Sequence, residues 1–375
     1  MMKRVVILCF SVIFLLKYSY AQADSIPLFS TLRMEIRADF EYHHYMTTSS
    51  YTLVSHNDDT YGFIGRYFNL HLGGNLTKNL SYYFRQRIVA NSGSSTFFDN
   101  TDFLYLNYQI NPQWSIRVGK DALAVGGFEY DAPPIDVLFW SYYWDNFHCF
   151  QIAVGAKYKS LDGKNTIVLQ AGNSPYLHSS SLFKNSLFSY NLLWNGKFGC
   201  FQTLYSFNMF QRDKKGHFMN YIALGNQLTF KKVDFYVDFI HRATSLKQLM
   251  KDFGIIARLN VHCNNNFTLF LKGGYEQNLD QDEYNNYLLT GEIWDCLALP
   301  GQRYSYGGIG CEYRPKRCPD IRIHGYVADF CTHNLKDETA PMNARGLYKI
   351  EQNITVNVGI SWNIDILRYI NKRIK

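Results

Sequence analysis

Residues 32–42 alternate between apolar and charged side chains without a break. The apolar set is Leu32, Met34, Ile36, Ala38, Phe40 and Tyr42, and the charged set is Arg33, Glu35, Arg37, Asp39 and Glu41. A repeat of two residues is that of a β-strand, whose successive side chains point to opposite faces, and a helix does not produce it. Strands of soluble proteins usually have about five or six residues, whereas a tilted strand needs about 9–11 residues to cross a bilayer. The alternation therefore predicts a membrane-crossing strand.

The same alternation recurs to the end of the chain. It is clearest in residues 80–88, 114–119, 233–239, 267–277 and 354–364. Short connections are expected at 75–79, 111–113, 159–165, 195–199, 231–232, 262–266 and 315–320. Longer connections are expected at 43–60, 91–100, 121–148, 173–185, 211–218, 243–252, 278–303 and 331–347. These connections imply about sixteen antiparallel strands with both chain ends on the short-turn side, as in outer-membrane barrels.

A sheet of so many long, half-apolar strands avoids an exposed edge only by closing on itself. We therefore expect an all-β fold, a transmembrane antiparallel up-and-down barrel over residues 32–364, with a short segment 22–31 before it and a basic tail 365–375 after it. The alternative is a soluble β-sandwich or solenoid. The sequence shows no repeat of fixed length, and its 17% aromatic and 18% charged residues favour the barrel over a soluble sheet.

The N-terminus has the layout of a secretory signal peptide. Lys3 and Arg4 precede an apolar run over residues 5–16, and small residues lead up to Ala21. Cleavage is expected after residue 21, with residue 23 as a second candidate. An uncleaved anchor is the weaker alternative because a spanning helix needs about 20 apolar residues. The sequence therefore predicts an exported protein in the outer membrane of a Gram-negative cell, with both termini in the periplasm.

Composition excludes several other roles. The basic residues are scattered and the net charge is +7, which does not indicate nucleic-acid binding. Seven cysteines follow the leader, and no Cys-x-x-Cys pair occurs among them, so neither a metal site nor a cofactor site is expected. An odd number also cannot pair completely within one chain. No catalytic motif is visible, and His71 and His324 have no evident serine partner, so we do not expect an enzyme.

If the apolar residues face lipid, the opposite face of each strand lines a lumen of mixed charge. A basic wall is expected from pore-lining Arg33, Arg37, Arg85, Arg87 and Arg117. The further basic lumen residues are Arg258, Lys272 and Arg322, and the acidic ones are Glu35, Asp39, Glu41, Asp102, Asp234, Asp238 and Glu276. Charged groups in a dry core would be costly, so the lumen should hold water. The arginines could set ion selectivity, or they could pair with neighbouring carboxylates and only pack the wall.

The third long connection, residues 121–146, is unusually aromatic and apolar for a solvent-exposed segment. We expect it to fold into the barrel and narrow it, although a surface lid or subunit contact is the alternative. Its acidic residues are Asp121, Glu129, Asp131 and Asp136, and they would face the arginine wall as a constriction. Opposed charges across a pore would order water and sort polar solutes.

Several segments of the first half resemble the phosphate-selective porin O and P family. They are the runs from Arg66 through Leu76, Tyr82 through Arg87, Asp102 through Tyr108, and Trp114 through Lys120, followed by the Gly-Gly-Phe-Glu at residues 126–129. The resemblance covers about residues 30–150. It implies a sixteen-stranded, usually homotrimeric barrel whose third loop narrows the pore. Family members line that constriction with arginine and lysine, whereas this connection carries carboxylates, which argues against phosphate selectivity.

The sequence thus predicts an outer-membrane porin, a passive channel for small hydrophilic or ionic solutes, in contact with outer-membrane lipids. The alternative is a surface-binding protein or adhesin that uses the long connections 278–303 and 331–347. An energised receptor would need a plug domain of about a hundred residues before the first strand, and the short segment 22–31 offers none.

Overall fold

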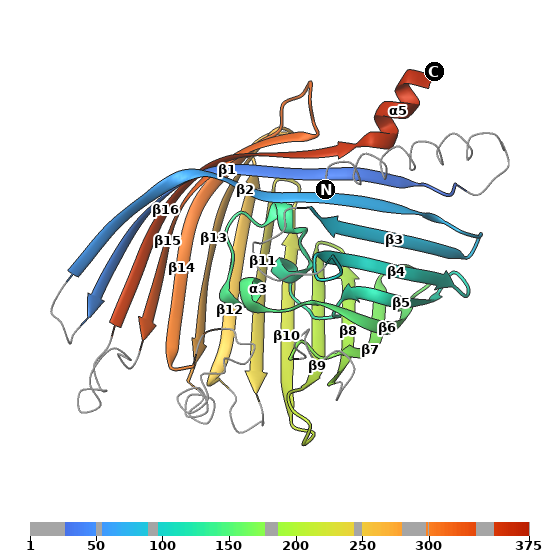
Figure 1. Ribbon diagram of the computed structural model, residues 1–375, viewed down its shortest axis with the longest axis horizontal. Helices are drawn as coiled ribbons and strands as arrows, with labels where there is room; N and C mark the ends of the chain where they lie inside the picture. Colours follow the sequence, from blue (N-terminus) through green and yellow to red (C-terminus); the bar gives the residue numbers. More distant parts are fainter. Residues whose placement is uncertain are drawn as a thin grey trace.

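The computed structural model describes residues 27–49, 55–88, 97–176, 187–243, 250–279, 298, 300–334 and 349–374. In this part of the chain, sixteen antiparallel strands close into one barrel in which each strand pairs with its neighbours in sequence and β1 pairs with β16 (Figure 1). The expected fold class and strand number are confirmed. The signal peptide expected at residues 1–21 lies outside the described residues, as does most of connections 278–303 and 331–347.

The first eight strands are β1 (Thr31–Ser49), β2 (Ser55–Asn75), β3 (Leu80–Arg87), β4 (Thr101–Gln109), β5 (Trp114–Ala122), β6 (Phe150–Lys159), β7 (Asn165–Asn173) and β8 (Phe188–Phe198). The second eight are β9 (Phe201–Gln211), β10 (Phe218–Thr229), β11 (Val233–Ala243), β12 (Asp252–His262), β13 (Phe267–Asn278), β14 (Gln302–Tyr313), β15 (Ile321–Asn334) and β16 (Lys349–Asp365). The helical segments are α2 (Phe128–Asp131), η1 (Pro134–Asp136), α3 (Tyr142–Asn146) and α5 (Ile366–Ile374).

The first hairpin is longer than expected. β1 has 19 residues and β2 has 21, so most of the connection expected at 43–60 is paired strand. The two strands stay in register as far as Thr48 and Ser55, and the polar side chains His44 and Asp59 interact there at 2.6 Å. The sequence did not predict this extension because its side chains are polar. A strand that extends beyond the membrane does not need an apolar face, so the alternation is lost there.

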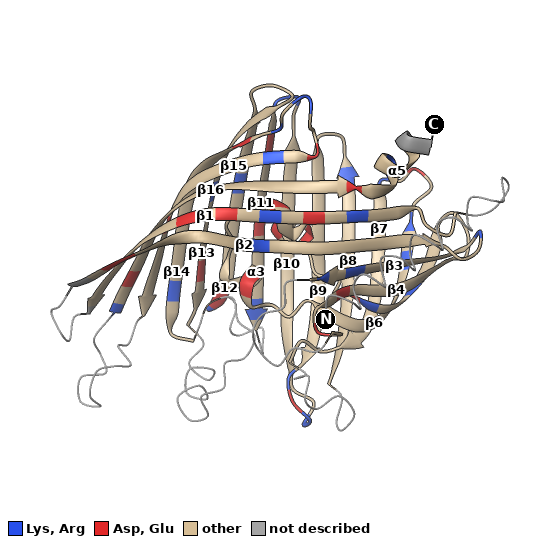
Figure 2. Ribbon diagram, turned by 45° about the horizontal axis from the view of Figure 1, so that its top comes forward, with Lys and Arg blue, Asp and Glu red and all other residues tan. Residues whose placement is uncertain are grey.

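The two faces of the wall have inverted polarity compared with a soluble protein. Side chains that point outward are apolar and exposed, for example Leu104, Val154 and Leu169. Side chains that point inward are polar and buried, and Arg37, Asp39 and Glu41 are each at most 4% exposed. Figure 2 shows several red and blue bands close together along β1. An apolar exterior around a polar interior is the arrangement that a bilayer requires of a barrel.

The first described residues, 27–30, and helix α5 both lie at the short-turn rim. The Ser30 N–H donates to the Gly73 carbonyl oxygen, and the Asn75 N–H donates to the Pro27 carbonyl oxygen. Residues 27–30 therefore lie along the end of β2. The expected basic tail forms α5 directly after β16. Arg368 and Tyr369 of this helix bind Asp320 in the turn between β14 and β15. No helix in the described ranges is long and apolar enough to cross a membrane.

Candidate functional site

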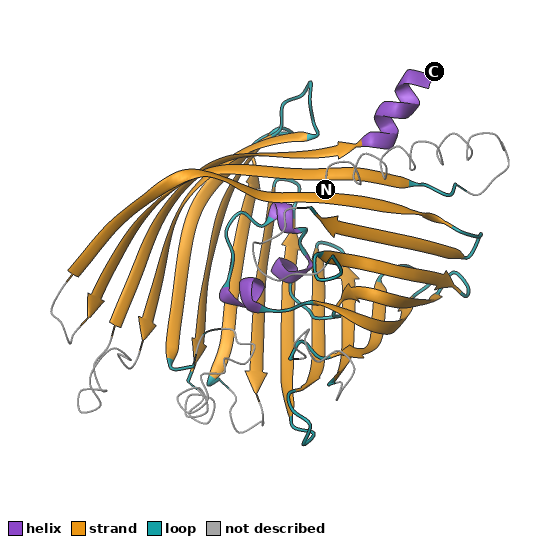
Figure 3. Cartoon of the chain, in the orientation of Figure 1, coloured by secondary structure: helices purple, strands orange, loops and turns teal. Residues whose placement is uncertain are grey.

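The connection between β5 and β6, residues 123–149, enters the space enclosed by the strands, and Figure 3 shows its short helices inside the outline of the barrel. Its backbone reaches strands from opposite parts of the sheet. Ala124 binds Gln170 of β7 and Asn208 of β9, while Val137 and Leu138 accept hydrogen bonds from Arg37 of β1. A segment that contacts β1, β7 and β9 at once lies across the lumen.

Carboxylates of the wall hold the backbone N–H groups of this β5–β6 connection. Asp238 of β11 accepts hydrogen bonds from the N–H groups of Phe128 and Glu129, both at 2.8 Å. Glu276 of β13 accepts from the N–H groups of Tyr142 and Tyr143 at 2.8 and 3.1 Å. These acceptors satisfy the first turns of α2 and α3, where intrahelical partners are missing. A negative charge at a helix N-terminus is also electrostatically favourable.

Basic groups of the wall bind the carbonyls of the same connection. Arg37 donates to Val137 and Leu138 at 2.9 and 3.1 Å, and Arg322 of β15 donates to the Ile135 carbonyl at 2.5 Å. Lys272 of β13 donates to the Phe139 carbonyl and pairs with Glu129 at 2.5 Å. Donors and acceptors on the wall thus match the backbone of the connection along its length, which fixes its path.

Two adjacent glycines allow the close approach at the start of the connection. Gly127 has a φ of 105°, a conformation that side chains with a Cβ rarely adopt. A Cβ on Gly126 would lie 2.5 Å from the Leu204 carbonyl oxygen of β9. Instead, the Gly126 N–H donates to the Ser206 hydroxyl at 2.8 Å. The Gly-Gly pair noted in the sequence therefore brings the backbone onto the wall.

Apolar packing completes the anchoring. Leu123, Val125, Tyr143 and Phe147 of the connection form one buried cluster with inward-facing residues of β9 to β12, which are Phe210, Met219, Tyr221, Ala223, Ile240 and Ile256. Leu138 and Phe139 form a second cluster with residues of β13 to β15, which are Phe270, Tyr304, Tyr306, Tyr326 and Ala328. The aromatic composition of the segment is explained by these contacts, because an apolar segment inside a polar barrel needs an apolar part of the wall.

The predicted arginines of β3 and β5 lie on the inner face, each beside a carboxylate. Arg85 and Arg87 both bind Asp102 of β4 at 2.9 Å, and Arg117 binds Asp121 at 2.8 Å. Aromatic rings also support two of them, since Arg85 lies 4.5 Å from the centre of Phe103 and Arg117 lies 4.1 Å from the centre of Tyr105. This pairing matches the packing alternative, yet Arg87 and Arg117 keep 43% and 37% of their side-chain surface exposed.

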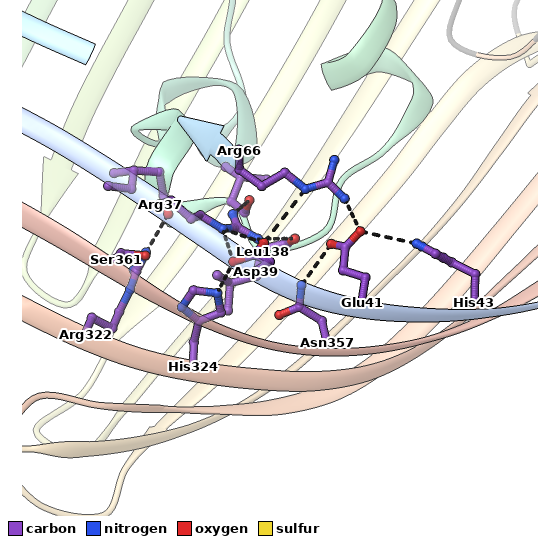
Figure 4. Close-up of polar contacts among 12 residues, drawn as sticks. Arg37, Asp39, Glu41, His43, Arg66, Leu138, Arg322, His324, Asn357 and Ser361 are labelled. Carbon is purple, nitrogen blue, oxygen red and sulfur yellow. Dashed lines mark hydrogen bonds and ion pairs between the residues drawn. The ribbon is translucent and has the colours of Figure 1, made fainter. Parts of the chain in front are cut away.

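The β1 members of the predicted wall behave differently. Arg37 is almost fully buried, and besides the two carbonyls it binds Asp39, as Figure 4 shows. Asp39 in turn accepts from His324 of β15 at 3.0 Å. Arg37 therefore holds the β5–β6 connection against β1. Arg33 remains partly exposed and has no ion-pair partner within the described ranges.

The acidic residues expected in the connection are not all where the sequence analysis placed them. Asp121 belongs to β5, because the inner-face alternation continues through Arg117 and Asp121, and it lines the wall instead of the connection. Glu129 pairs with Lys272, and Asp136 pairs with Arg322 at 2.6 Å, so both face β13 to β15 and not the arginines of β3 and β5. Only Asp131 lies on that side, exposed and within the electrostatic reach of Lys157 of β6.

The structure adds three charged residues that sequence reasoning missed. Lys157 is opposite the inward-facing Ser115 in the β5–β6 register, so alternation alone could have found it. Arg66 is the extra residue of β2 at the register shift between Arg37 and Ala38, which breaks the alternation. Asp145 in α3 is exposed, and the charge of Arg66 acts on it. Desolvation raises the pKa of Asp145, and Arg66 opposes this rise.

The remaining reactive groups have structural partners. His71 contacts Glu35 at 3.0 Å and Tyr83 at 2.6 Å, and His324 binds Asp39, so neither histidine meets a serine. Burial raises the pKa of the Cys149 thiol to about 12, which leaves it unreactive. The six cysteines in the described ranges are free, and those ranges contain no cluster of three residues suited to hold a metal.

Comparisons with known proteins agree with this fold. Residues 36–180 match the family described as phosphate-selective porin O and P. An anion-selective porin from Comamonas acidovorans superposes with a TM-score of 0.59 at 13% identity, covering 89% of this chain and 99% of its own. The outer-membrane channel DcaP of Acinetobacter baumannii gives 0.57 at 12% identity and 89% and 96% coverage, and OprB of Pseudomonas putida gives 0.53 at 10% identity and 88% and 94% coverage. No curated protein sequence matches the chain.

The family match begins within β1 and includes the strands from β2 to β7 and the whole β5–β6 connection. The structural matches include nearly the entire barrel, and at these identities they bear on the fold alone. Through residues 36–180 the chain matches the phosphate-selective porin O and P family, and this match together with the closed sixteen-stranded barrel supports an outer-membrane porin channel.

Proposed function

We propose that this porin is a passive diffusion channel for small hydrophilic solutes, with a weak preference for anions and no selectivity for phosphate. The observation that supports this proposal is that the interior of the barrel is divided into two parts. The β5–β6 connection packs against β9 to β15, and charged side chains on β3 to β6 face the remaining space.

The charges bordering that space support the anion preference. Two arginines, Arg85 and Arg87, share the carboxylate of Asp102, so positive charge exceeds negative charge in this contact. Lys157 has no ion-pair partner among the residues described. On the opposite side, Asp131 and Asp145 of the connection supply negative charge. Mixed charge of this kind biases ion flow without creating a strong binding site.

Phosphate selectivity would require several basic groups free to bind one anion. Arg37, Arg117, Arg322 and Lys272 already bind carboxylates or backbone carbonyls. The basic groups that remain accessible come from separate strands. This supports a channel with general anion preference.

Purified protein in a planar lipid bilayer tests the proposal. We expect stepwise, ohmic single-channel currents in potassium chloride, and a reversal potential in a salt gradient that indicates a small excess of chloride over potassium flux. Added phosphate should reduce the chloride current no more than sulfate does. A bilayer that stays closed would overturn the channel, and block by phosphate alone would overturn the lack of phosphate selectivity.

We also propose that both chain ends face the periplasm and that the protein is a homotrimer in outer-membrane lipids. The first point is supported by the position of residues 27–30 and α5 at the short-turn rim. An epitope after residue 375 should be inaccessible to antibody on intact cells and accessible after the outer membrane is opened. The mass of the detergent-solubilised complex, corrected for bound detergent, should be that of three chains.

A further inference from the structure

A cavity of about 450 Å³ opens on the long-connection side of the β5–β6 connection. Its floor is formed by the connection, and its wall is formed by residues of β1, β2, β14, β15 and β16. Its aromatic lining residues are Tyr45, Phe139, Trp140, Tyr142, Tyr304, Tyr326 and Phe330. The volume falls within the range of sites that hold a small organic molecule.

The rings of this cavity are held in fixed orientations. Tyr142 and Tyr304 are stacked with their centres 3.8 Å apart and 12° between their planes. The Tyr142 hydroxyl and the Thr332 hydroxyl are 3.1 Å apart, within hydrogen-bond distance. Phe139 lies 5.0 Å from the centre of Tyr326. A preformed set of ring faces favours a ligand that itself has flat apolar faces, because little conformational entropy is lost on binding.

The rim of the cavity is polar and partly unsatisfied. The imidazole of His43 lies 3.0 Å from the Thr355 hydroxyl and 3.4 Å from the side-chain amide nitrogen of Asn353. The Asn353 side-chain oxygen is buried and accepts no hydrogen bond from the described residues. A buried acceptor without a partner costs about 1–3 kcal/mol, so a ligand hydroxyl that donates to it would be favoured.

The charges around the cavity disfavour an anionic ligand. Its single arginine, Arg66, binds Glu41, and its guanidinium lies 5.3 Å from the centre of the Trp140 ring (Figure 4 shows the Glu41 contact). Asp145 and Glu351 add two carboxylates to the lining. Lys349 neutralises one of them by pairing with Glu351 at 2.7 Å. The lining therefore carries no free positive charge.

We propose that this cavity binds a neutral sugar of one or two pyranose rings before it passes the β5–β6 connection. The C–H faces of a pyranose pack on aromatic rings, and its hydroxyls donate to and accept from groups such as Asn353 and Thr355. This sugar site depends on the proposed porin function in one respect, which is that the cavity lies at the mouth of an open channel.

Two measurements separate the sugar site from the channel. Binding of glucose and maltose to the detergent-solubilised protein is followed by tryptophan fluorescence, with Trp140→Phe identifying the signal of the cavity. We expect saturable binding that Asn353→Leu and Tyr304→Ala each weaken by about tenfold, since one lost hydrogen bond or ring contact amounts to about 1.4 kcal/mol. Tyr105→Ala, on the inner wall of β4 outside the cavity, is the matched control and should leave sugar affinity unchanged.

Ion current through the same variants in a planar bilayer is the second measurement. Maltose should block the current of the parent protein and block Asn353→Leu less, while both conduct equally in its absence. An open channel without saturable sugar binding would overturn the sugar site and leave the porin function intact. Tighter binding of inorganic phosphate or of tetraethylammonium than of maltose would overturn the choice of a neutral ligand. Saturable binding by a protein that does not conduct would overturn the proposed function alone.

Discussion

Two parts of the barrel interior differ in what their inward side chains contact. We call the inner faces of β9 to β15 the occupied wall, because the β5–β6 connection packs on them. The inner faces of β3 to β6 form the open wall, where Arg87, Arg117 and Lys157 border the remaining space. On the occupied wall the charged groups satisfy a backbone, and on the open wall they remain available to ions. Alternation alone places both sets inside the barrel, so lumen position does not by itself identify a functional charge.

Of all the changes proposed, removal of the β5–β6 connection should have the largest effect, because it would abolish the difference between the occupied wall and the open wall. Replacing residues 124–147 by a short glycine-serine linker would free the occupied wall and widen the lumen. We expect single-channel conductance to increase several-fold, because conductance rises with the open cross-section. Replacement of the turn at residues 161–163 is the control, since this turn lies between β6 and β7 at the short-turn rim. Unchanged conductance in the deletion variant would show that the connection does not limit flow.

The matched lysines Lys272 and Lys157 test the two walls directly. Lys272→Met removes the partner of the buried Glu129 and of the Phe139 carbonyl, whereas Lys157 has no ion-pair partner in the described ranges. Breaking a buried ion pair from one side costs about 3–5 kcal/mol, so the free energy of unfolding should fall by this amount. Lys157→Met should change it by no more than about 0.5 kcal/mol. Urea unfolding in detergent, followed by tryptophan fluorescence, measures both.

The double variant Lys272→Met with Glu129→Gln distinguishes charge burial from packing. It removes the carboxylate charge that Lys272→Met leaves without its partner, and it should recover a large part of the stability lost in Lys272→Met. Equal losses in the single and double variants would contradict an electrostatic role for this pair and indicate that the lysine acts by packing.

The sequence predicts the barrel well because the bilayer imposes a local rule. Every strand must present alternate apolar residues, so residues 32–42 reveal a strand without knowledge of its neighbours. It predicts the partners in the interior less well, because those depend on contacts distant in sequence. Glu129 meets Lys272, 143 residues away, and Asp136 meets Arg322, 186 residues away. The aromatic content of the connection showed that it needs an apolar surface, but only the fold shows which strands supply it.

The open wall should control ion preference. Arg87→Gln and Arg117→Gln each remove an exposed positive charge, so the small anion preference should fall, and the double variant should be neutral or weakly cation-preferring. The reversal potential in a potassium chloride gradient measures this. Arg258→Gln is the control on the occupied wall, because Arg258 is paired with Glu312 at 2.9 Å and its side chain is only 13% exposed. Equal shifts from all three single variants would contradict the division of the lumen into two walls.

The smallest expected effect is a pH dependence that comes from Asp131. Desolvation inside the barrel raises the pKa of Asp131 above the ordinary aspartate value, although Lys157 partly opposes the rise. As the pH falls, this carboxylate is neutralised earlier than an ordinary aspartate, so the lumen loses negative charge and its anion preference increases. Asp131→Asn should show the increased preference already at neutral pH and should lack the corresponding step as the pH is lowered.

Asp162→Asn is the matched control for this step. Asp162 lies in the exposed turn after β6, and the Ser160 hydroxyl lowers the pKa of its carboxylate. It therefore stays ionised over the same pH range and lies away from the lumen, so its replacement should leave the titration of the reversal potential unchanged. If Asp131→Asn retains the step, the titrating group lies elsewhere, and the exposed Asp145 of α3, whose pKa is also raised by desolvation, is the next carboxylate to replace. A pH step that is absent after replacement of Asp131 or Asp145 and still present in Arg87→Gln and Arg117→Gln would show that the β5–β6 connection supplies the titrating carboxylate of the pore.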